Sequence, residues 1–589
     1  MPLPHPASSA GPSGRSASMS RHMPVVACSA RPKPSPSTST TSGMPGGAGA
    51  WPGERRYTPP PTAAGNGSGA AGRSSGRHGS ATVASRARCS WTSRPPASGA
   101  STSPPGTQPT GSRPASSGNC AASAAGSPLT TMRDGTALLD SPTVTTASTE
   151  MIDVARYAVQ ETGRMDIDQR LDLIAAGARA IAAGEQAIED LAVAEAGQAR
   201  KFARREIGSA LDLLDALPDL AEAIRPREVP ARSGTTHLEF APYGVVFGWH
   251  SANSPIWVPT LIAASAFAGG NAVLARPSRR VGATTARVLE ALTYRWPLGA
   301  VQVVSAPPDE AEALIAAPGV DAVVAHASTA TCRRHLARLS AAYAEGATMR
   351  PYIPEASGND AIIVLDGADM DRAADAAALG GFANAGQLCM AAKRIIVERA
   401  ARDEFVPRLI EAVRGLVTGP ADDERTDVAP IASTALARAV DDLEEALAAG
   451  GKVITGGGAS AGGDSHPHAG VPFEPTVVLL PRSALHVRLW RDESFAPLRG
   501  LAIADDARQA VALANDTPFG LGAAVFGPHE AAMNVATALK GARITVNEGP
   551  LYQDPHLVVG GIGDSGLAGA RPKVEQLVFA RRVHVAAPG

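Results

Sequence analysis

One cysteine lies in a turn of small residues directly before an apolar, strand-like run. The turn occupies residues 384–394 and reads Asn-Ala-Gly-Gln-Leu-Cys-Met-Ala-Ala-Lys-Arg, so the cysteine is Cys389, and the apolar run follows at residues 395–397. A cysteine can act as a nucleophile where the protein also supplies a thiolate, donors for an oxyanion and a base. The chain offers the amide of Asn253 and the carboxylate of Glu355 as candidates for donor and base.

The composition is that of a globular protein rather than a nucleic-acid or membrane binder. The 589 residues carry 54 basic and 56 acidic side chains, and 44% of them are hydrophobic, so little net charge is left to attract an anionic polymer or surface. The length allows two or three domains. The longest apolar stretch, residues 258–275, is broken by Pro, Ser, Gly and Asn, which argues against a transmembrane helix. We therefore expect no nucleic-acid partner and no membrane partner.

The cysteines and histidines argue against a disulfide framework and against a metal site. An odd number of cysteines without Cys-x-x-Cys spacing fits a reducing compartment, and the 13 histidines form no His-Glu-x-x-His motif. We therefore expect a cytoplasmic protein without a metal, in which Cys332 is a buried small hydrophobe. The five cysteines are Cys28, Cys89, Cys120, Cys332 and Cys389.

Residues 1–148 differ in kind from the rest of the chain. Before Asp134 the only acidic residue is Glu54, while Arg, Ser, Pro and Gly dominate. Such a segment cannot bury enough apolar surface to offset the entropy of ordering, so we predict a disordered basic extension. We favour a dispensable extension, or a true start at Met132 or Met151, over a tail that binds nucleic acid or an anionic surface.

Helices come first in the following part of the chain, and strands and helices then alternate. From Asp153 an Ala-rich pattern with helical apolar spacing runs until Pro218 interrupts it, and residues 235–240 predict an edge or tail strand. The next predicted strands are 244–249, 272–275, 301–305 and 322–325, with helices at 258–267, 282–292 and 308–316. This alternation predicts right-handed βαβ units in a mostly parallel sheet, which binds ligands at the carboxyl ends of its strands. Asn253, Arg276 and Ser328 all follow such ends.

A second alternating block follows Glu355. Its predicted strands cover residues 361–365, 394–397, 452–455, 476–480, 500–504, 523–526 and 543–546, and its helices cover 370–379, 403–416, 434–448 and 508–514. Each block is long enough to form its own domain. Cys389 is then expected to face the first block across a cleft.

Several short motifs together resemble the aldehyde dehydrogenase superfamily over residues about 150–589. They follow the family order, and Glu355 and Cys389 stand 34 positions apart, as in the family pattern. The motifs are Gly-Val-Val at 244–246 leading to Asn-Ser-Pro at 253–255, Arg-Pro-Ser at 276–278, Ala-Ser-Thr at 327–329, Glu355 with Gly358, Gly-Gln-Leu-Cys at 386–389, Glu-Ser-Phe-Ala-Pro at 493–497, Asn-Asp-Thr-Pro-Phe-Gly-Leu at 515–521, and Gly-Gly at 560–561 with Ser-Gly at 565–566.

The resemblance implies an α/β fold with two Rossmann-like parallel-sheet domains and a small β oligomerisation arm. Its domains would be a coenzyme-binding domain at 149–357, interrupted by an arm strand near 224–242, a catalytic domain at 358–548, and a carboxyl-terminal oligomerisation tail at 549–589. By analogy with the family, a homodimer or homotetramer is expected.

The same resemblance implies NAD(P)-dependent oxidation of an aldehyde to a carboxylic acid. Cys389 would attack the aldehyde, Asn253 would stabilise the oxyanion, and Glu355 would activate water to hydrolyse the thioester, a task that favours a carboxylate with a raised pKa. The residues implied for cofactor binding are Arg276, Ser278, Arg279, Ser328, Glu493 and Phe495, of which Glu493 would hold the nicotinamide ribose.

Departures from the family pattern bear on the cofactor. Arg276 stands where relatives usually have Lys, and Arg279 stands where many NAD-preferring relatives have Glu. A carboxylate there would hold the ribose hydroxyls and repel a 2′-phosphate, whereas guanidinium groups match phosphate geometry. We therefore predict a preference for NADP over NAD, unless Arg279 and Arg280 simply start a solvated helix.

Two other functions remain open at this point. A CoA-acylating relative would pass the acyl group to a thiol, and such enzymes often lack the base, so Glu355 favours water. A non-catalytic scaffold is the third hypothesis, and the presence of Asn253, Glu355 and Cys389 argues against it. The sequence leaves the aldehyde itself open.

Overall fold

The computed structural model describes residues 144–457, 470–556, 560–567, 569 and 573–586, all within the compact unit Cys120–Gly589. Residues 1–143 of the predicted disordered extension lie outside the described residues. Residues 144–148, the last five of the predicted extension, begin helix α1, Val144–Thr162. Ile152, Ala155 and Ala158 of α1 are buried.

In the described part of the chain, four α-helices precede the first strand. Helix α2 begins with a capping box between Asp166 and Gln169, and it buries the apolar face predicted from helical spacing. Helix α4 runs past Pro218 to Ala221, so Pro218 does not interrupt it as predicted. A proline this close to a helix end removes only one ladder hydrogen bond. The helices are α1 Val144–Thr162, α2 Ile167–Ala183, α3 Glu185–Leu191 and α4 Arg200–Ala221.

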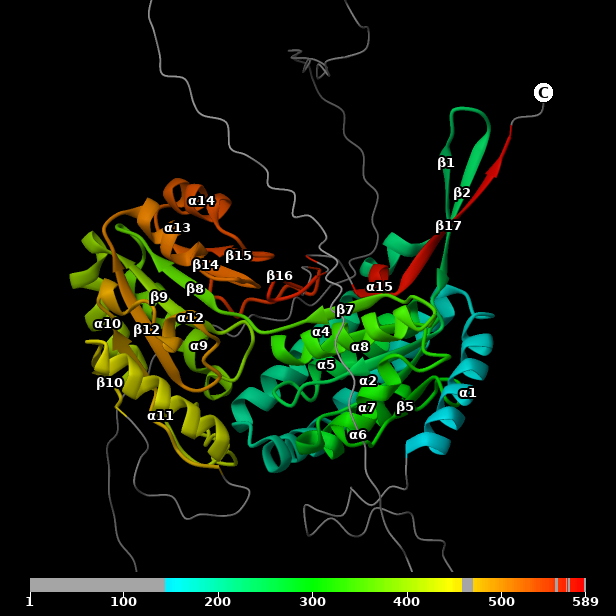
Figure 1. Ribbon diagram of the computed structural model, residues 1–589, viewed down its shortest axis with the longest axis horizontal. Coiled ribbons are helices and arrows are strands. Elements are labelled where there is room, and N and C mark those ends of the chain that lie inside the picture. The colour runs from blue at the N-terminus through cyan, green and yellow to red at the C-terminus, as the bar shows by residue number, and fades with distance from the viewer. Residues whose placement is uncertain (1–143, 458–469, 557–559, 568, 570–572, 587–589) are drawn as a thin grey trace, which may run out of the picture. The chain divides into compact units, whose positions relative to one another are not determined.

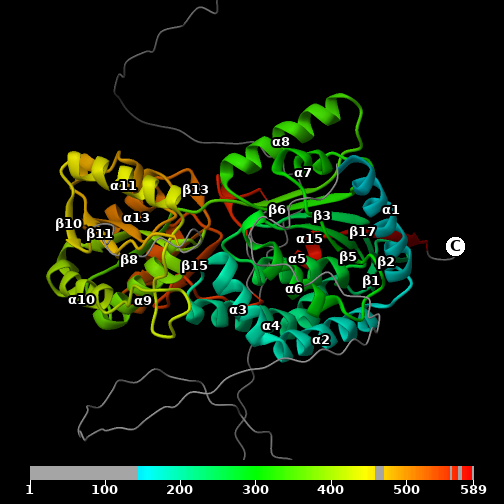
Figure 2. The same cartoon turned by 90° about the horizontal axis from the view of Figure 1, so that it is seen from below.

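A five-stranded sheet follows, with the strand order β5-β4-β3-β6-β7. All of its strands are parallel. Helices α5 and α6 cover one face, and α7 and α8 cover the other (Figure 2). The sequence missed β7, whose four residues end at Glu355. The elements are β3 Val245–Trp249, α5 Trp257–Ala268, β4 Ala272–Arg276, α6 Gly282–Thr293, β5 Val301–Val303, α7 Pro308–Ile315, β6 Ala322–His326, α8 Thr329–Ala344 and β7 Tyr352–Glu355.

A seven-stranded sheet forms the second block, in the order β10-β11-β12-β9-β8-β14-β15. Its strands are parallel except for β10, which pairs antiparallel with β11. The strands are β8 Asp360–Val364, β9 Ala392–Glu398, β10 Lys452–Thr455, β11 Thr476–Leu479, β12 Leu498–Ala504, β14 Gly522–Phe526 and β15 Arg543–Val546. The helices are α9 Met370–Phe382, α10 Arg402–Arg414, α11 Ser433–Ala448, α12 Arg488–Arg491, α13 Ala507–Asn515 and α14 His529–Ala538.

Three further strands form an antiparallel arm that stands away from the five-stranded sheet (Figure 1). They are β1 Arg227–Pro230, β2 Thr235–Pro242 and β17 Val578–Val585, and the sequence missed β1. Strand β17 pairs with β2 along its whole length. The short helix α15, Lys573–Gln576, leads into β17, and a two-stranded ribbon joins β13 Phe519–Gly520 to β16 Ile562–Gly563.

Each large sheet has its own apolar core. The first core spans residues 152–353 and is completed by Val574, Leu577 and Val578 near the carboxyl end. The second core spans residues 361–536. Glu355 and Cys389 lie in the sequence at the border between these two cores, and the tail that follows the second core packs back onto the first.

Candidate active site

The carboxyl end of the five-stranded sheet positions Glu355. Glu355 ends β7 and His326 ends β6, and the two are direct partners in the parallel register. The carboxylate oxygen Oε2 of Glu355 lies 3.2 Å from Nδ1 of His326, and the two side chains are 5% and 3% exposed. In parallel sheets the carboxyl ends of the strands carry ligand-binding groups. Glu355 follows this rule, although its strand β7 was not predicted from the sequence.

The loop that carries Cys389 has an unusual backbone. Asn384, Ala385 and Gly386 are all in the left-handed region, with φ values of 51°, 53° and 73°. Such conformations cost about 1–3 kcal/mol for non-glycine residues and persist only where the surroundings impose them. A side chain on Gly386 would collide with Arg499 and with the Ala496 carbonyl, which explains why a glycine stands there.

Two buried cations impose this loop conformation. Arg499, fully buried, donates hydrogen bonds to the carbonyls of Gly381 at 2.7 Å and Gly386 at 3.2 Å. Lys393, also fully buried, donates to the carbonyls of Leu388 at 2.6 Å and of Cys389. The charges are thus satisfied by backbone carbonyls, and they fix the position of the cysteine.

The electrostatics of the two candidate catalytic groups differ. Burial raises the pKa of the Cys389 thiol well above its usual value, and the charge of Glu355 raises it further. Burial also raises the pKa of Glu355, but His326, through its hydrogen bond and charge, together with Cys389 and Lys573, outweighs burial and leaves the pKa below the usual value. The expectation of a raised pKa for Glu355 was therefore wrong, because no motif in the sequence indicates the buried histidine beside it.

A buried glutamate holds the loop after β3, which contains Asn253. Glu206 accepts hydrogen bonds through Oε1 from the Ser254 hydroxyl at 2.7 Å and from the backbone N–H groups of Ile256 and Trp257 at 2.9 Å. The Asn253 carbonyl accepts from Asn384 Nδ2 at 3.1 Å, which ties this loop to the cysteine loop. Sequence reasoning missed Glu206. The signal was a charged residue on the buried face of an amphipathic helix.

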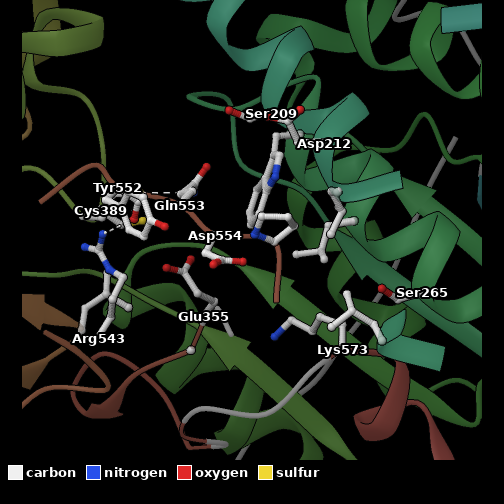
Figure 3. Close-up of a pocket in the computed structure, with 18 residues that line it drawn as sticks. Ser209, Asp212, Ser265, Glu355, Cys389, Arg543, Tyr552, Gln553, Asp554 and Lys573 are labelled. Carbon is white, nitrogen blue, oxygen red and sulfur yellow. Dashed lines mark hydrogen bonds between the residues drawn. The ribbon is translucent and has the colours of Figure 1, made fainter. Parts of the chain in front are cut away.

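Two cavities meet at Cys389 and Glu355. The larger, of about 440 Å³, extends from the Asn253 loop to α11. The smaller, of about 70 Å³, extends towards α4, α5 and the chain near residue 554. Cys389 and Glu355 line both cavities, and Figure 3 shows them among the side chains of the smaller one. A nucleophile and a carboxylate placed between two cavities can serve two ligands at once.

The residues predicted to bind the cofactor fall into two groups. Ser328, Glu493 and Phe495 line the larger cavity, and Ser328 also caps the first turn of α8. Arg276, Ser278 and Arg279 are not among the residues that line it. The guanidinium of Arg276 is buried and stacks on Trp249, with Cζ 4.0 Å from the ring centroid.

The turn after β4 brings a different arginine to the cavity. Ser278 caps the short helix Arg279–Val281. Arg279 and Arg280 are both exposed, and of the two only Arg280 lines the larger cavity. Glu493 also accepts a hydrogen bond from the Gly358 N–H at 2.9 Å and lies 3.6 Å from Lys393. The described residues contain no cluster of three His, Cys, Asp or Glu that could hold a metal ion.

The comparisons with known proteins agree with this geometry. The profile of the aldehyde dehydrogenase family matches residues 132–579. The chain belongs to the aldehyde dehydrogenase family. It is an oxidoreductase that oxidises aldehydes with NAD or NADP.

The named relatives of this aldehyde dehydrogenase include enzymes for different aldehydes. A succinate-semialdehyde dehydrogenase [NADP(+)] from Deinococcus radiodurans is 29% identical over 434 residues, which cover 73% of this chain and 88% of the relative. A vanillin dehydrogenase from Corynebacterium glutamicum is 27% identical over 425 residues, covering 70% of this chain and 84% of the relative. The structure of an NAD-dependent aldehyde dehydrogenase from Sinorhizobium meliloti is 26% identical, with a TM-score of 0.70 and coverage of 75% of this chain and 88% of that one.

Proposed function

We propose that Cys389 is the nucleophile of this aldehyde dehydrogenase, Asn253 its oxyanion donor and Glu355 its general base. The observation that carries the proposal is the position of Cys389 and Glu355 at the junction of the two cavities. The aldehyde then reaches the Cys389 sulfur through the smaller cavity. The cofactor reaches the aldehyde carbon bonded to that sulfur through the larger cavity.

The proposed mechanism follows from the local chemistry of these groups. Because burial favours the thiol form of Cys389, attack on the aldehyde needs a proton acceptor, and Glu355 is the carboxylate beside it. Glu355 releases this proton to solvent before deacylation, so that it is ionised again for the second step. The Asn253 amide and the Cys389 backbone N–H donate to the oxyanion of the hemithioacetal without adding charge. A bound nicotinamide supplies the acceptor for the hydride. Glu355 then takes a proton from water as the water oxygen bonds to the thioester carbon and the sulfur departs.

The larger cavity carries groups that suit a dinucleotide. A hydroxyl at the first turn of a helix, here Ser328, suits a phosphate group, the guanidinium of Arg280 suits a second anionic group, and the carboxylate of Glu493 suits ribose hydroxyls. Arg279 and Arg280 support a preference for NADP, and the NADP-named relative from Deinococcus radiodurans agrees with it.

A small aldehyde with a carboxylate is the substrate class that the smaller cavity favours. Lys573 lines this cavity and is only 4% exposed, and its ammonium has no hydrogen-bond partner among the described residues. A buried cation without a partner is costly, and a substrate carboxylate would satisfy it. Three carboxylates also line this cavity. Glu355 attracts the Lys573 ammonium electrostatically but makes no hydrogen bond to it, Asp212 is exposed, and Asp554 accepts hydrogen bonds from His556.

The proposal extends to location and assembly. No helix among the described residues is long and apolar enough to cross a membrane, and the cysteine usage supports the cytoplasm. One face of β17 carries Phe579, Val583 and Val585, which are all exposed. An exposed apolar strand face supports a homodimer or homotetramer formed through the arm.

The test is reduced-cofactor absorbance with the full chain and a panel of short, long, aromatic and carboxylated aldehydes, each with NAD and with NADP. Turnover that needs no CoA and disappears in Cys389→Ala is expected. Turnover that requires CoA would favour the acylating alternative. Cofactor binding without turnover of any aldehyde would favour the scaffold.

A further inference from the structure

Three titratable side chains stand in a row at the carboxyl end of the five-stranded sheet. His326 and Glu355 end the adjacent strands β6 and β7. His250 follows directly after β3, on the other side of β6, whose register pairs Trp249 with Ala325. The row therefore runs across three neighbouring strands and ends at the proposed base. The mechanism given above uses only Glu355.

The contacts within the row are few and specific. His326 Nδ1 lies 3.2 Å from Glu355 Oε2. His326 Nε2, both ring nitrogens of His250 and Glu355 Oε1 have no hydrogen-bond partner among the described residues. Buried polar atoms without partners are rare. Because His326 holds Oε2 at 3.2 Å, it restricts rotation of the carboxylate and leaves Oε1 as the oxygen available to a proton donor.

Other groups near the pair do not replace this bond. Burial lowers the pKa of His250 to about 3, so His250 is neutral and adds no charge. Four other titratable groups interact electrostatically with the row. They are Cys389 in the cysteine loop, Cys332 in α8, Lys573 in α15 and Arg276 at the end of β4. Three of the groups near Glu355 lower its pKa and so favour the charged carboxylate: His326, Cys389 and Lys573.

We propose that His326 is a positioning residue for deacylation, which orients the Glu355 carboxylate and keeps it ionised in its buried site. The inference rests on the proposed role of Glu355. In the step concerned, Glu355 accepts a proton from water, the water oxygen bonds to the acyl carbon, and the carbon–sulfur bond breaks to release the Cys389 thiolate. A carboxylate that is already protonated cannot take part, and burial alone favours the protonated form.

The test compares His326→Ala and His326→Asn in the full chain, each alone and combined with Glu355→Gln. His326→Ala is expected to lower kcat by about 10- to 100-fold without lowering the amplitude of the first turnover. Reduced cofactor should then appear as a burst of one equivalent per site, because deacylation limits the rate. The acid limb of kcat should move to higher pH, since the Glu355 pKa rises when its hydrogen-bond donor is lost. Asn can donate from a position near Nδ1 and should restore much of the rate.

A matched control separates positioning from a general structural loss. His335 is also fully buried in this domain and bonds Tyr352 rather than Glu355, so His335→Ala should lower the melting temperature without moving the acid limb. In the Glu355→Gln background, His326→Ala should cause no further loss of kcat, because both variants remove one function.

Two results would overturn the inference. One is an acid limb that stays in place in both His326 variants. The other is an equal fold-loss in the wild-type and Glu355→Gln backgrounds. If instead the proposed role of Glu355 as general base were wrong, Glu355→Gln alone would leave kcat unchanged, which distinguishes that failure from a failure of the positioning role of His326.

Discussion

At the scale of single residues, this active site depends on where charge is buried. Lys393 and Arg499 are buried cations that donate to backbone carbonyls, and such groups are tolerated only when their donors are satisfied. Lys573 differs from these two, because its ammonium has no hydrogen-bond partner among the described residues, although the charge of Glu355 attracts it. Since Lys573 also lines the smaller cavity, its ammonium is the buried charge to examine for a ligand.

Lys573→Met should weaken the binding of carboxylated aldehydes selectively. Loss of a charged hydrogen bond of about 1.5–3 kcal/mol should raise KM for succinate semialdehyde by about 10-fold or more, with little change for an uncharged aldehyde of the same length. Burial lowers the pKa of Lys573 to about 8, so the ammonium is lost as pH rises through 8. In the wild type, KM for the carboxylated substrate should therefore increase above that pH.

Steady-state kinetics with the two substrates across pH give the measurement. Lys452→Met, which changes an exposed lysine of β10, is the control. An equal change of KM for both substrates in Lys573→Met would refute the anion-binding role.

At the scale of elements, strand ends and helix starts decide which side chains reach the cavities. The turn between β4 and α6 contains two arginines side by side, yet the short helix Arg279–Val281 directs only the second towards the larger cavity. Adjacent residues on a helical turn point in different directions. The sequence argument for NADP named Arg279, because local sequence does not show which of the two side chains reaches the cavity. The preference for NADP itself stays a prediction.

Arg280→Glu should reduce the preference for NADP more than Arg279→Glu does. Both positions are exposed, but only position 280 lines the larger cavity, so a carboxylate there lies nearer to a bound 2′-phosphate and is screened from it less than one at position 279. We expect kcat/KM with NADP to fall by about 10-fold or more in Arg280→Glu, with a smaller loss with NAD. The measurement is the ratio of the two efficiencies in both variants. A larger change in Arg279→Glu would assign the role to Arg279, as first predicted, and no change in either would remove the basis for NADP preference.

At the scale of the whole molecule, the carboxyl-terminal segment connects parts that are distant in the chain. It adds Val574 and Leu577 to the first core and completes the arm as β17. The segment also carries Lys573, so one short stretch of chain contributes to the first core, to the smaller cavity and to the proposed assembly surface. Changes in this segment are expected to alter activity and assembly together.

Val583→Asp should dissociate the proposed oligomer. Val583 is 44% exposed on the apolar face of β17, and a charge buried between apolar strand faces is strongly unfavourable. Sedimentation velocity should show a monomer for Val583→Asp. His584→Asp, on the opposite face of the same strand, should keep the wild-type mass. A wild-type chain that sediments as a monomer would contradict the assembly proposal itself.

The sequence by itself determined the alternation of strands and helices, the resemblance to the aldehyde dehydrogenases and the candidate set of Asn253, Glu355 and Cys389. These follow from local periodicity and from motifs in which neighbouring residues carry the signal. Only the tertiary structure decided that Glu355 lies on a strand, that His326 lowers its pKa, that Glu206 holds the Asn253 loop and that Arg280 lines the cavity. Each of these depends on contacts between residues far apart in the chain, because the burial and charge of a side chain are set by neighbours that the fold brings together.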